Sequence, residues 1–237
     1  MRQDFKISYS RINTYLFCPY KYKLIYFDGV HVPINADITF GHIIHKTLEQ
    51  FHSGKKQVYD VLFEYYDDVW KNDGFNDPHQ IFEYYKRGKV MLTNYYASFI
   101  NSNSKVLYVE KAFNTNIGKY KFVGIIDRID IFDNSKHEII DYKTHLKVWN
   151  QKMVDQDLQL SFYTYACKNV FGLNINKISI YFLSENKKIY TKRSRNEIIN
   201  AMNIATKIAK DIESEKFLPD TSKCKMCSLK LKCKCSL

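Results

Sequence analysis

The sequence predicts an α+β (α/β) fold in which a mixed β-sheet core is flanked by helices. Three observations lead to this fold class. Residues 5–101 carry apolar side chains at helical spacing, the pattern changes to a period of two from about residue 105, and helical segments follow the strands. With 237 residues and 45% hydrophobic content, the chain is able to bury a sizeable core.

The first hundred residues are expected to be helical. The stretch SYSRINTYLFCPYKYKLIY begins with Ser8 or Ser10 as a helix N-cap and continues with apolar residues at helical spacing. Two further helices are predicted at about residues 57–71 and 79–101, because the turn-rich segment NDGFNDPH separates them. Between these regions, the helix expected at residues 38–52 places four apolar side chains along one face: Phe40, Ile44, Leu48 and Phe51.

The second half of the chain is expected to supply the sheet. Three strands at residues 105–115, 119–132 and 136–144 are separated by the turns Asn116–Gly118 and Asp133–Ser135, which predicts an antiparallel meander. A helix at about 156–170, a strand pair and a long helix follow, and the tail from Asp220 has no period. The strand pair covers 177–183 and 188–193, and the long helix covers 195–215.

Charge and composition restrict the class of protein. The formal net charge of +11 favours a polyanionic partner, nucleic acid first, although a Lys-, Asn-, Ile- and Tyr-rich sequence also arises from an AT-rich genome. The opening MRQDFKISYS lacks an apolar signal region, and no apolar run is long enough to span a bilayer. We therefore expect a soluble cytoplasmic protein without a membrane partner. Its six cysteines would then stay reduced and suggest metal ligation rather than disulfides.

Two acids and a lysine stand out on the predicted strands. Because strand side chains alternate, Asp127 lies on a face of β-branched residues, where a carboxylate needs a partner or a metal. Asp141 and Lys143 share one face of the next strand and follow its apolar run. A surface ion pair and a structurally paired buried acid remain the alternatives. Arg128 and Asp130, on the other face, are interpreted as an ordinary solvent-exposed pair.

Three further side chains are candidates through their helical positions. His45 borders the buried stripe of its helix, where a histidine is more often a satisfied core residue. Gln159 and Tyr163 stand four residues apart on the helix at 156–170, so both can project a polar edge towards the sheet. Each observation is weak when taken alone.

Together GHIIH, GIIDRID, DYKT and QLSFY, in this order, resemble the PD-(D/E)xK nuclease superfamily, and more narrowly its RecB-type branch. The resemblance covers nearly the whole chain and implies a restriction-endonuclease-like core. It implies an Mg²⁺ or Mn²⁺ site with His45, Asp127, Asp141 and the Tyr142 carbonyl as ligands. It also implies Lys143 as the catalytic lysine beside Asp127 and Asp141, with Gln159 and Tyr163 in support. Glu110, in YVEKAF, matches a family glutamate less firmly and is left outside the predicted set.

The cysteine pattern resembles the iron–sulfur version of these nucleases. The resemblance implies a [4Fe–4S] cluster held by one distal cysteine and a C-terminal triplet: Cys18, Cys224, Cys227 and Cys233. A structural zinc site with four cysteine ligands is the alternative. Cys235 departs from the family pattern and is an alternative to Cys233 as the last ligand. Cys167, on the apolar side of its helix, is expected in the core.

The resemblance implies a DNA exonuclease that hydrolyses single-stranded ends in recombination, repair or CRISPR adaptation, with proteins of those pathways as further partners. A non-catalytic DNA-binding module of such a complex and a zinc-stabilised structural protein are the alternatives. Late basic residues are interpreted as a solvated face or as contacts to the DNA backbone: Lys187, Lys188, Lys192, Arg193, Arg195, Lys223, Lys225, Lys230, Lys232 and Lys234. The expected organisation is a single nuclease domain over 1–237, with a helical insertion at 38–101, a nuclease core at 105–215 and a cluster segment formed by 1–27 and 216–237.

Overall fold

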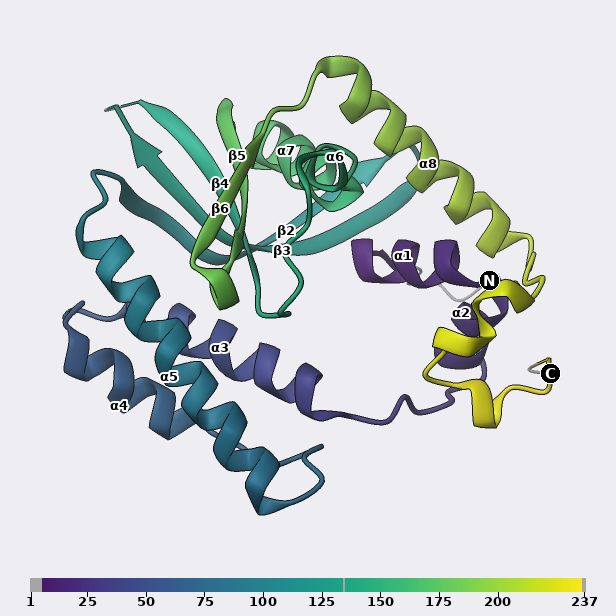
Figure 1. Cartoon of the computed structure of the whole chain (residues 1–237). Coiled ribbons are helices and arrows are strands. Elements are labelled where there is room, and N and C mark those ends of the chain that lie inside the picture. Colours follow the sequence, from purple (N-terminus) through teal and green to yellow (C-terminus); the bar gives the residue numbers. More distant parts are fainter. Residues whose placement is uncertain (1–5, 134, 236–237) are drawn as a thin grey trace. The chain divides into compact units, whose positions relative to one another are not determined.

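The computed structural model describes residues 6–133 and 135–235, and within them a mixed β-sheet is flanked by helices (Figure 1). Strand order is β1-β3-β4-β5-β6, with β2 paired to β3. The β3–β4 and β5–β6 pairs are antiparallel and the β4–β5 pair is parallel, which confirms the predicted fold class. The strands are β1 (Lys6–Ile7), β2 (Lys105–Ile117), β3 (Tyr120–Phe132), β4 (Lys136–Lys143), β5 (Ile175–Phe182) and β6 (Lys187–Thr191).

The helices follow the predicted order with small shifts at their ends. They are α1 (Tyr9–Phe17), α2 (Pro19–Tyr26), α3 (Ala36–Ser53), α4 (Tyr59–Val69), α5 (Pro78–Ile100), α6 (Gln151–Asp155), α7 (Leu158–Val170) and α8 (Arg195–Glu213). The Ser8 side chain accepts a hydrogen bond from the Arg11 N–H and caps α1, as predicted. In the tail, short 3₁₀ helices cover Thr221–Met226 and Lys230–Lys232.

The structure differs locally from the prediction in two respects, and one predicted turn includes a residue that is not described. The helix expected through residues 8–26 is broken at Cys18, whose backbone is extended because the following residue is Pro19. The short parallel strand β1 and the helix α6 were not predicted, since two and five residues are too few to show a period. The turn predicted at Asp133–Ser135 includes Asn134, which lies outside the described residues.

The chain separates into two compact units. Unit 1 contains Met1–Pro33, Phe113–Gly124 and Ser194–Leu237, and unit 2 contains Ile34–Ala112 and Ile125–Arg193. Strands β2 and β3 therefore contribute residues to both. Among the helices of the described residues, none is long and apolar enough to cross a membrane.

The core of unit 2 lies between helices α3, α4 and α5, which run side by side, and one face of β4 and β5 (Figure 1). The predicted apolar face of α3 is buried there: Phe40, Ile44, Leu48 and Phe51 are at most 1% exposed. Ile140 and Tyr142 of β4 meet this face, so the alternate residues of β4 point the other way, towards α7. Cys167 of α7 is fully buried, which confirms its predicted core position.

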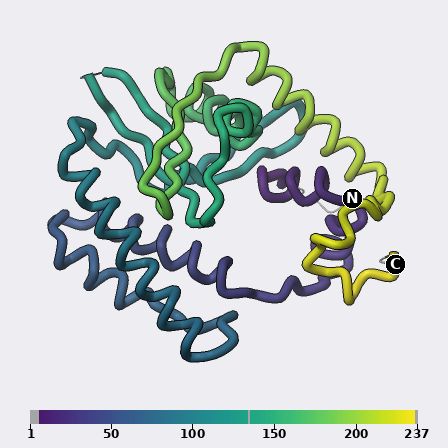
Figure 2. The backbone as a smooth tube through the Cα atoms, viewed as in Figure 1, coloured from purple at the N-terminus to yellow at the C-terminus, as the bar shows by residue number. Residues whose placement is uncertain are grey.

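Unit 1 brings the two ends of the chain together. The tail folds beside α1 and α2 (Figure 2), where the Tyr15 hydroxyl donates to the Lys216 carbonyl at 2.6 Å. The rings of Tyr22 and Phe217 stack with centroids 6.2 Å apart. Gly124, the glycine of GIIDRID, has a packing role here, because a Cβ atom would lie 2.5 Å from the Phe113 ring.

Candidate metal and active site

The site begins where the pairing between β3 and β4 ends. The antiparallel register pairs Arg128 with Ile140, so Asp127 and Asp141 follow one residue beyond this pair on adjacent strands. Asp141 is 1% exposed and Asp127 is 9% exposed. Asp127 Oδ2 accepts the Tyr142 backbone N–H at 2.8 Å, which fixes one carboxylate beside the other strand. The predicted convergence of the two acids is therefore present.

Helix α3 brings His45 to these acids. At Gly41 the helix lies close to the segment after β4, since a Cβ here would lie in van der Waals contact with Thr144 Oγ1 at 3.4 Å. His45 Nδ1 lies 3.6 Å from Asp127 Oδ2 and 3.7 Å from Glu110 Oε1. In residues 6–133 and 135–235, the one group of three side chains with donor atoms all within 4.8 Å of one another is His45, Glu110 and Asp127. Asp141 stands beside this group without meeting that distance.

Glu110 is the residue that the sequence analysis left out. Its φ of 42° puts it in the left-handed region inside strand β2, which interrupts the usual alternation of side chains. Strained backbone of this kind occurs at functional sites, where the surrounding structure stabilises it. Nothing in the YVEKAF pattern indicates a positive φ, so the only sequence signal was the family resemblance.

The acids and the histidine change one another's pKa values. Burial raises the pKa of Asp127 to about 7, and the Asp141 charge adds to this increase while His45 opposes it. Burial alone would lower the pKa of His45, but Asp127, Glu110 and Asp141 outweigh it and raise that pKa to about 9. The three acids therefore favour a positive charge at this position, which protonated His45 carries in the metal-free protein.

Lys143 is fixed between the acids and α7. Its Nζ lies 2.7 Å from Asp141 Oδ2 and donates to Gln159 Oε1 at 3.1 Å. Gln159 Nε2 in turn donates to the Tyr163 hydroxyl at 2.6 Å. Burial would lower the pKa of Lys143, but the Asp141 and Asp127 carboxylates reverse the effect and raise it. The lysine is therefore an ammonium ion that contributes positive charge rather than a base.

The donor set fits a hard divalent metal. Asp141 Oδ2 is buried and lies 2.7 Å from the Lys143 ammonium, which is its closest partner among the described residues. A buried carboxylate with one cationic contact keeps lone pairs that a metal ion can use. Carboxylate oxygens with one imidazole are ligands for Mg²⁺ and Mn²⁺.

The same residues line a cleft of about 650 Å³ in unit 2. His45, Asp127, Asp141, Lys143 and Gln159 contribute to its wall. The remaining lining residues come from α3, α5 and the segment after β4: Asp37, Phe40, Tyr84, Arg87, Tyr142, Thr144, His145, Leu146 and Lys147. The acids, the lysine and a space for a ligand thus occur together.

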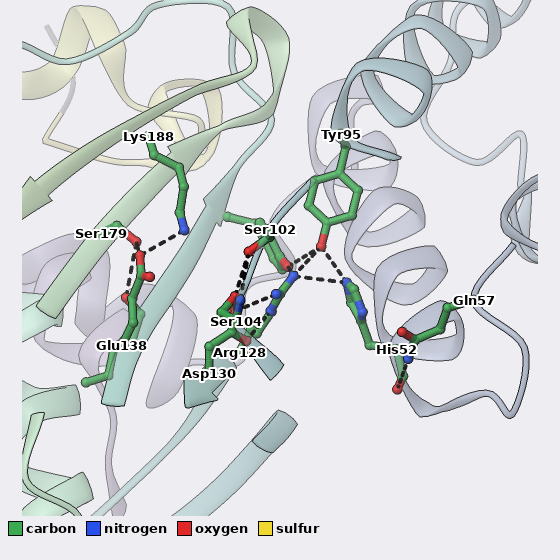
Figure 3. A network of polar contacts seen from close by, with 12 residues as sticks. His52, Gln57, Tyr95, Ser102, Ser104, Arg128, Asp130, Glu138, Ser179 and Lys188 are labelled. Carbon is green, nitrogen blue, oxygen red and sulfur yellow. Dashed lines mark hydrogen bonds and ion pairs between the residues drawn. The ribbon is translucent and has the colours of Figure 1, made fainter. Parts of the chain in front are cut away.

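On the opposite face of β3, the sequence-based interpretation of Arg128 and Asp130 is wrong. Arg128 and Asp130 are not an exposed pair, since Arg128 is 4% exposed and Asp130 is fully buried. Figure 3 shows their network. Arg128 Nε and Nη2 each donate to Asp130 at 2.5 Å, and Nη1 donates to the Tyr95 hydroxyl at 2.6 Å. His52 also contacts that hydroxyl. Sequence alternation could not show that α5 covers this face.

Two of the late basic residues are engaged in internal contacts. Lys188 forms a 2.8 Å ion pair with Glu138, which is 5% exposed as a side chain. Arg193 donates to the carbonyls of Val154 and Asp157, both at 2.9 Å, and so fixes the chain between α6 and α7. These two residues are structural, in contrast to the solvated face or DNA contact considered from sequence.

The cysteines meet in unit 1. One small cavity is lined by Cys18, Cys224, Cys227, Cys233 and Cys235. The Asp220 N–H donates to Cys18 Sγ at 3.3 Å, so the first helical break and the tail are in direct contact. No three of these sulfur atoms, all in the described part of the chain, lie within 4.8 Å of one another.

Comparison with known proteins gives the family and agrees with the fold. The sequence model of the PD-(D/E)XK nuclease superfamily matches residues 6–234. The structure of a candidate exonuclease from Eubacterium rectale aligns with 96% of this chain and 87% of its own, with 9% identity and a TM-score of 0.57, a likeness of fold alone. The structure of SSO0001 aligns with 95% of this chain and 97% of its own, with 19% identity and a TM-score of 0.42. A search of curated proteins gives no significant match. The chain belongs to the PD-(D/E)XK nuclease superfamily, whose members are metal-dependent nucleases.

Proposed function

We propose that this member of the PD-(D/E)XK nuclease superfamily is a DNA exonuclease that hydrolyses phosphodiester bonds at single-stranded ends. The observation that carries the proposal is the cleft in which the half-buried Lys143 ammonium lies 2.7 Å from buried Asp141, with Asp127 and His45 in the same wall. Its PD-(D/E)xK elements are Asp127, Asp141 and Lys143. A module that only binds DNA has no need of this costly arrangement.

The proposed metal ligands are His45, Glu110, Asp127 and Asp141, with the Tyr142 carbonyl as a further one. Glu110 is included because its carboxylate oxygen lies within 4.8 Å of the donor atoms of both His45 and Asp127. When bound, Mg²⁺ or Mn²⁺ supplies Lewis-acid stabilisation of phosphate charge. The Tyr142 N–H holds Asp127 in place, so the strand pairing itself orients this ligand.

Lys143 is proposed as the catalytic lysine. As an ammonium ion it orients the attacking water and stabilises the negative charge that develops on the phosphate. Gln159 and Tyr163 act as positioning residues, because the chain of hydrogen bonds from Tyr163 through Gln159 ends on Lys143 Nζ.

Preference for single strands is supported by the lining of the cleft. Tyr84 and His145 border it together with the acids, and rings in such a position stack on unpaired bases. The charge needed for backbone binding is concentrated in unit 1, with 16 Lys and Arg against 7 Asp and Glu, whereas unit 2 has 20 against 18. Backbone contacts from unit 1 would be independent of base sequence.

The test is digestion of end-labelled single- and double-stranded DNA with Mg²⁺, with Mn²⁺ and with EDTA. We expect products to shorten progressively from an end of the single strand, only when metal is present. Internal cuts in a circular single strand would contradict the exonuclease assignment. DNA binding without cleavage under every metal condition would favour the non-catalytic module instead.

We also propose that Cys18, Cys224, Cys227 and Cys233 hold a [4Fe–4S] cluster, as in the RecB-type branch of the superfamily. The proposal is supported by the cavity that these four cysteines line together with Cys235. A structural zinc ion with cysteine ligands is the alternative. The cluster would fasten residues 1–27 to residues 216–237.

Iron analysis of anaerobically purified protein tests this proposal. We expect brown protein with roughly four irons per chain. Cys18→Ala and Cys227→Ala should lose the colour and fold poorly, whereas Cys235→Ala should keep it as the matched control. Colourless protein that contains zinc would contradict the iron–sulfur assignment.

For the cellular context, we propose a cytoplasmic enzyme that acts in recombination, repair or CRISPR adaptation together with proteins of that pathway.

A further inference from the structure

Arg87 of α5 is a cation in the cleft that the proposed reaction does not use. Its guanidinium carbon lies 4.3 Å from the centre of the Phe40 ring and 4.0 Å from that of Tyr84. Phe40 is 1% exposed and belongs to the buried face of α3, so one of these two rings is anchored in the core. Contacts with two rings hold the planar guanidinium in one orientation.

Packing between α4 and α5 sets the position of Arg87. The next residue is Gly88, where a Cβ atom would lie 2.0 Å from the Tyr66 hydroxyl oxygen. That hydroxyl donates to the Tyr85 carbonyl at 3.1 Å, on the other side of Arg87. A glycine inside a helix is unfavourable in itself, so this close contact is a specific feature that fixes where the arginine stands.

The charge of Arg87 is only weakly compensated. The nearest acid, Asp37, is 4.0 Å from Nη2, and its side chain is 78% exposed. The Tyr84 hydroxyl, which donates to Asp37 at 2.8 Å, also interacts with the guanidinium. The Arg87 side chain is still 25% exposed and lines the cleft, and a guanidinium in such a position binds a phosphate through two parallel hydrogen bonds.

We propose that Arg87 binds a backbone phosphate of the DNA strand other than the one being cleaved, and so holds the strand in the cleft. The inference rests on the proposed function, because it takes the cleft as the path of the strand. It adds a substrate-binding residue on a helix that contributes none of the metal ligands. The ligand class is a phosphodiester within a nucleic-acid strand.

The test is a set of short single strands, each with one phosphate replaced by a neutral methylphosphonate. Binding is measured by fluorescence anisotropy in EDTA, so that no cleavage is needed. With the wild-type protein, one position should lose roughly tenfold or more in affinity, as expected for a hydrogen bond to a charged group. Arg87→Gln should bind the unmodified strand more weakly by a similar factor and should no longer respond to that position.

Three variants serve as controls. Lys86→Gln removes the same charge from the neighbouring, 57% exposed side chain and should leave affinity and pattern unchanged. Arg87→Lys keeps the charge without the planar fork and should lose part of the affinity, which covers the case of a poorly folded Arg87→Gln. Asp37→Asn should leave DNA affinity unchanged or increase it. An equal loss in Asp37→Asn and Arg87→Gln would mean that the ion pair is only structural, and would overturn the inference.

Failure of this inference is distinct from failure of the proposed function. An Arg87→Gln protein that keeps the wild-type methylphosphonate pattern contradicts the phosphate contact, even if the enzyme is an exonuclease. If the methylphosphonate pattern is as predicted but no DNA is cleaved in Mg²⁺ or Mn²⁺, the phosphate contact is supported and the exonuclease assignment is contradicted. A wild-type protein that binds no DNA would overturn both.

Discussion

The two faces of the β3–β4 pair bury acids in opposite ways. On one face Asp127 and Asp141 stand together, and the Lys143 ammonium contacts Asp141 Oδ2 at 2.7 Å while it also donates to Gln159. On the other, Asp130 accepts two hydrogen bonds from Arg128 and a third from Ser104 at 2.7 Å (Figure 3). A buried acid that is fully paired stabilises a scaffold, whereas neighbouring acids with too few partners require a cation.

Two histidines of α3 report the same difference. His45 and His52 are seven residues apart, two turns along one helix. The acids around His45 outweigh its burial and raise its pKa to about 9. Burial, and then the Arg128 charge, lower the pKa of His52 well below its ordinary value. The comparison teaches that the balance of buried charge separates the site from the scaffold, because both contain an Asp, a Tyr and a His.

The largest effect is expected from the acid face. Lys143→Ala should reduce cleavage by roughly 10²- to 10³-fold, because it removes charge stabilisation of the developing phosphate anion. DNA affinity should stay within about twofold, since one contact among many is lost. Single-turnover cleavage with a parallel binding titration measures both. Cleavage near the wild-type rate would remove Lys143 from the mechanism.

On the Arg128 face the expected loss is in folding rather than in chemistry. Arg128→Met should lower the free energy of unfolding by about 3–5 kcal/mol, because Asp130 is left buried without its cation. Urea unfolding measures this value. The matched double variant Arg128→Met with Asp130→Leu should recover much of the loss, because no unpaired charge remains. A single-variant loss below about 1 kcal/mol would show that the pair is not the buried ion pair described here.

The smallest effect is a pair of opposite pH dependences in metal-free protein. His45 has a raised pKa, so its stabilising contribution is complete below about pH 6.5 and is lost as pH rises through about 9. His52 has a lowered pKa, so stability is lost as pH falls below about 6.5, where only the unfolded chain takes up the proton.

Each histidine should carry one side of the pH profile, and for His45 a pKa raised from 6.5 to about 9 corresponds to at most about 3 kcal/mol. His45→Gln should flatten the decline between about pH 6.5 and 9, and His52→Gln should flatten the decline on the acid side. Urea titrations at a series of pH values, in EDTA, measure both. Identical profiles for the two variants would contradict the charge difference between the faces.

Sequence alone predicted the parts that depend on local periodicity. Strand alternation put Asp141 and Lys143 on one face, and helical spacing gave the buried side of α3. The antiparallel meander explains why Asp127 and Asp141 lie side by side on adjacent strands, because a short turn between antiparallel neighbours fixes their register. The order of the four motifs then led to the family that the comparison shows.

The remaining features depend on contacts distant in sequence. Helix α5 meets Arg128 through the Tyr95 hydroxyl, and the place of Glu110 depends on a positive φ that no residue pattern indicates. Lys188 and Arg193 look like surface charges until Glu138 and the α6–α7 backbone meet them. Even the glycine of GIIDRID is explained by the Phe113 ring rather than by chemistry.

The central claim is that the acids of one face bind a divalent metal and the acid of the other does not. Manganese binding, measured by electron paramagnetic resonance of free Mn²⁺, tests it in three proteins at neutral pH. We expect the wild-type protein to bind Mn²⁺, Asp127→Asn to lose roughly 10-fold or more in affinity, and folded Asp130→Asn to bind as the wild type does. Equal affinity in the wild type and Asp127→Asn, or a selective loss in Asp130→Asn, would contradict the account.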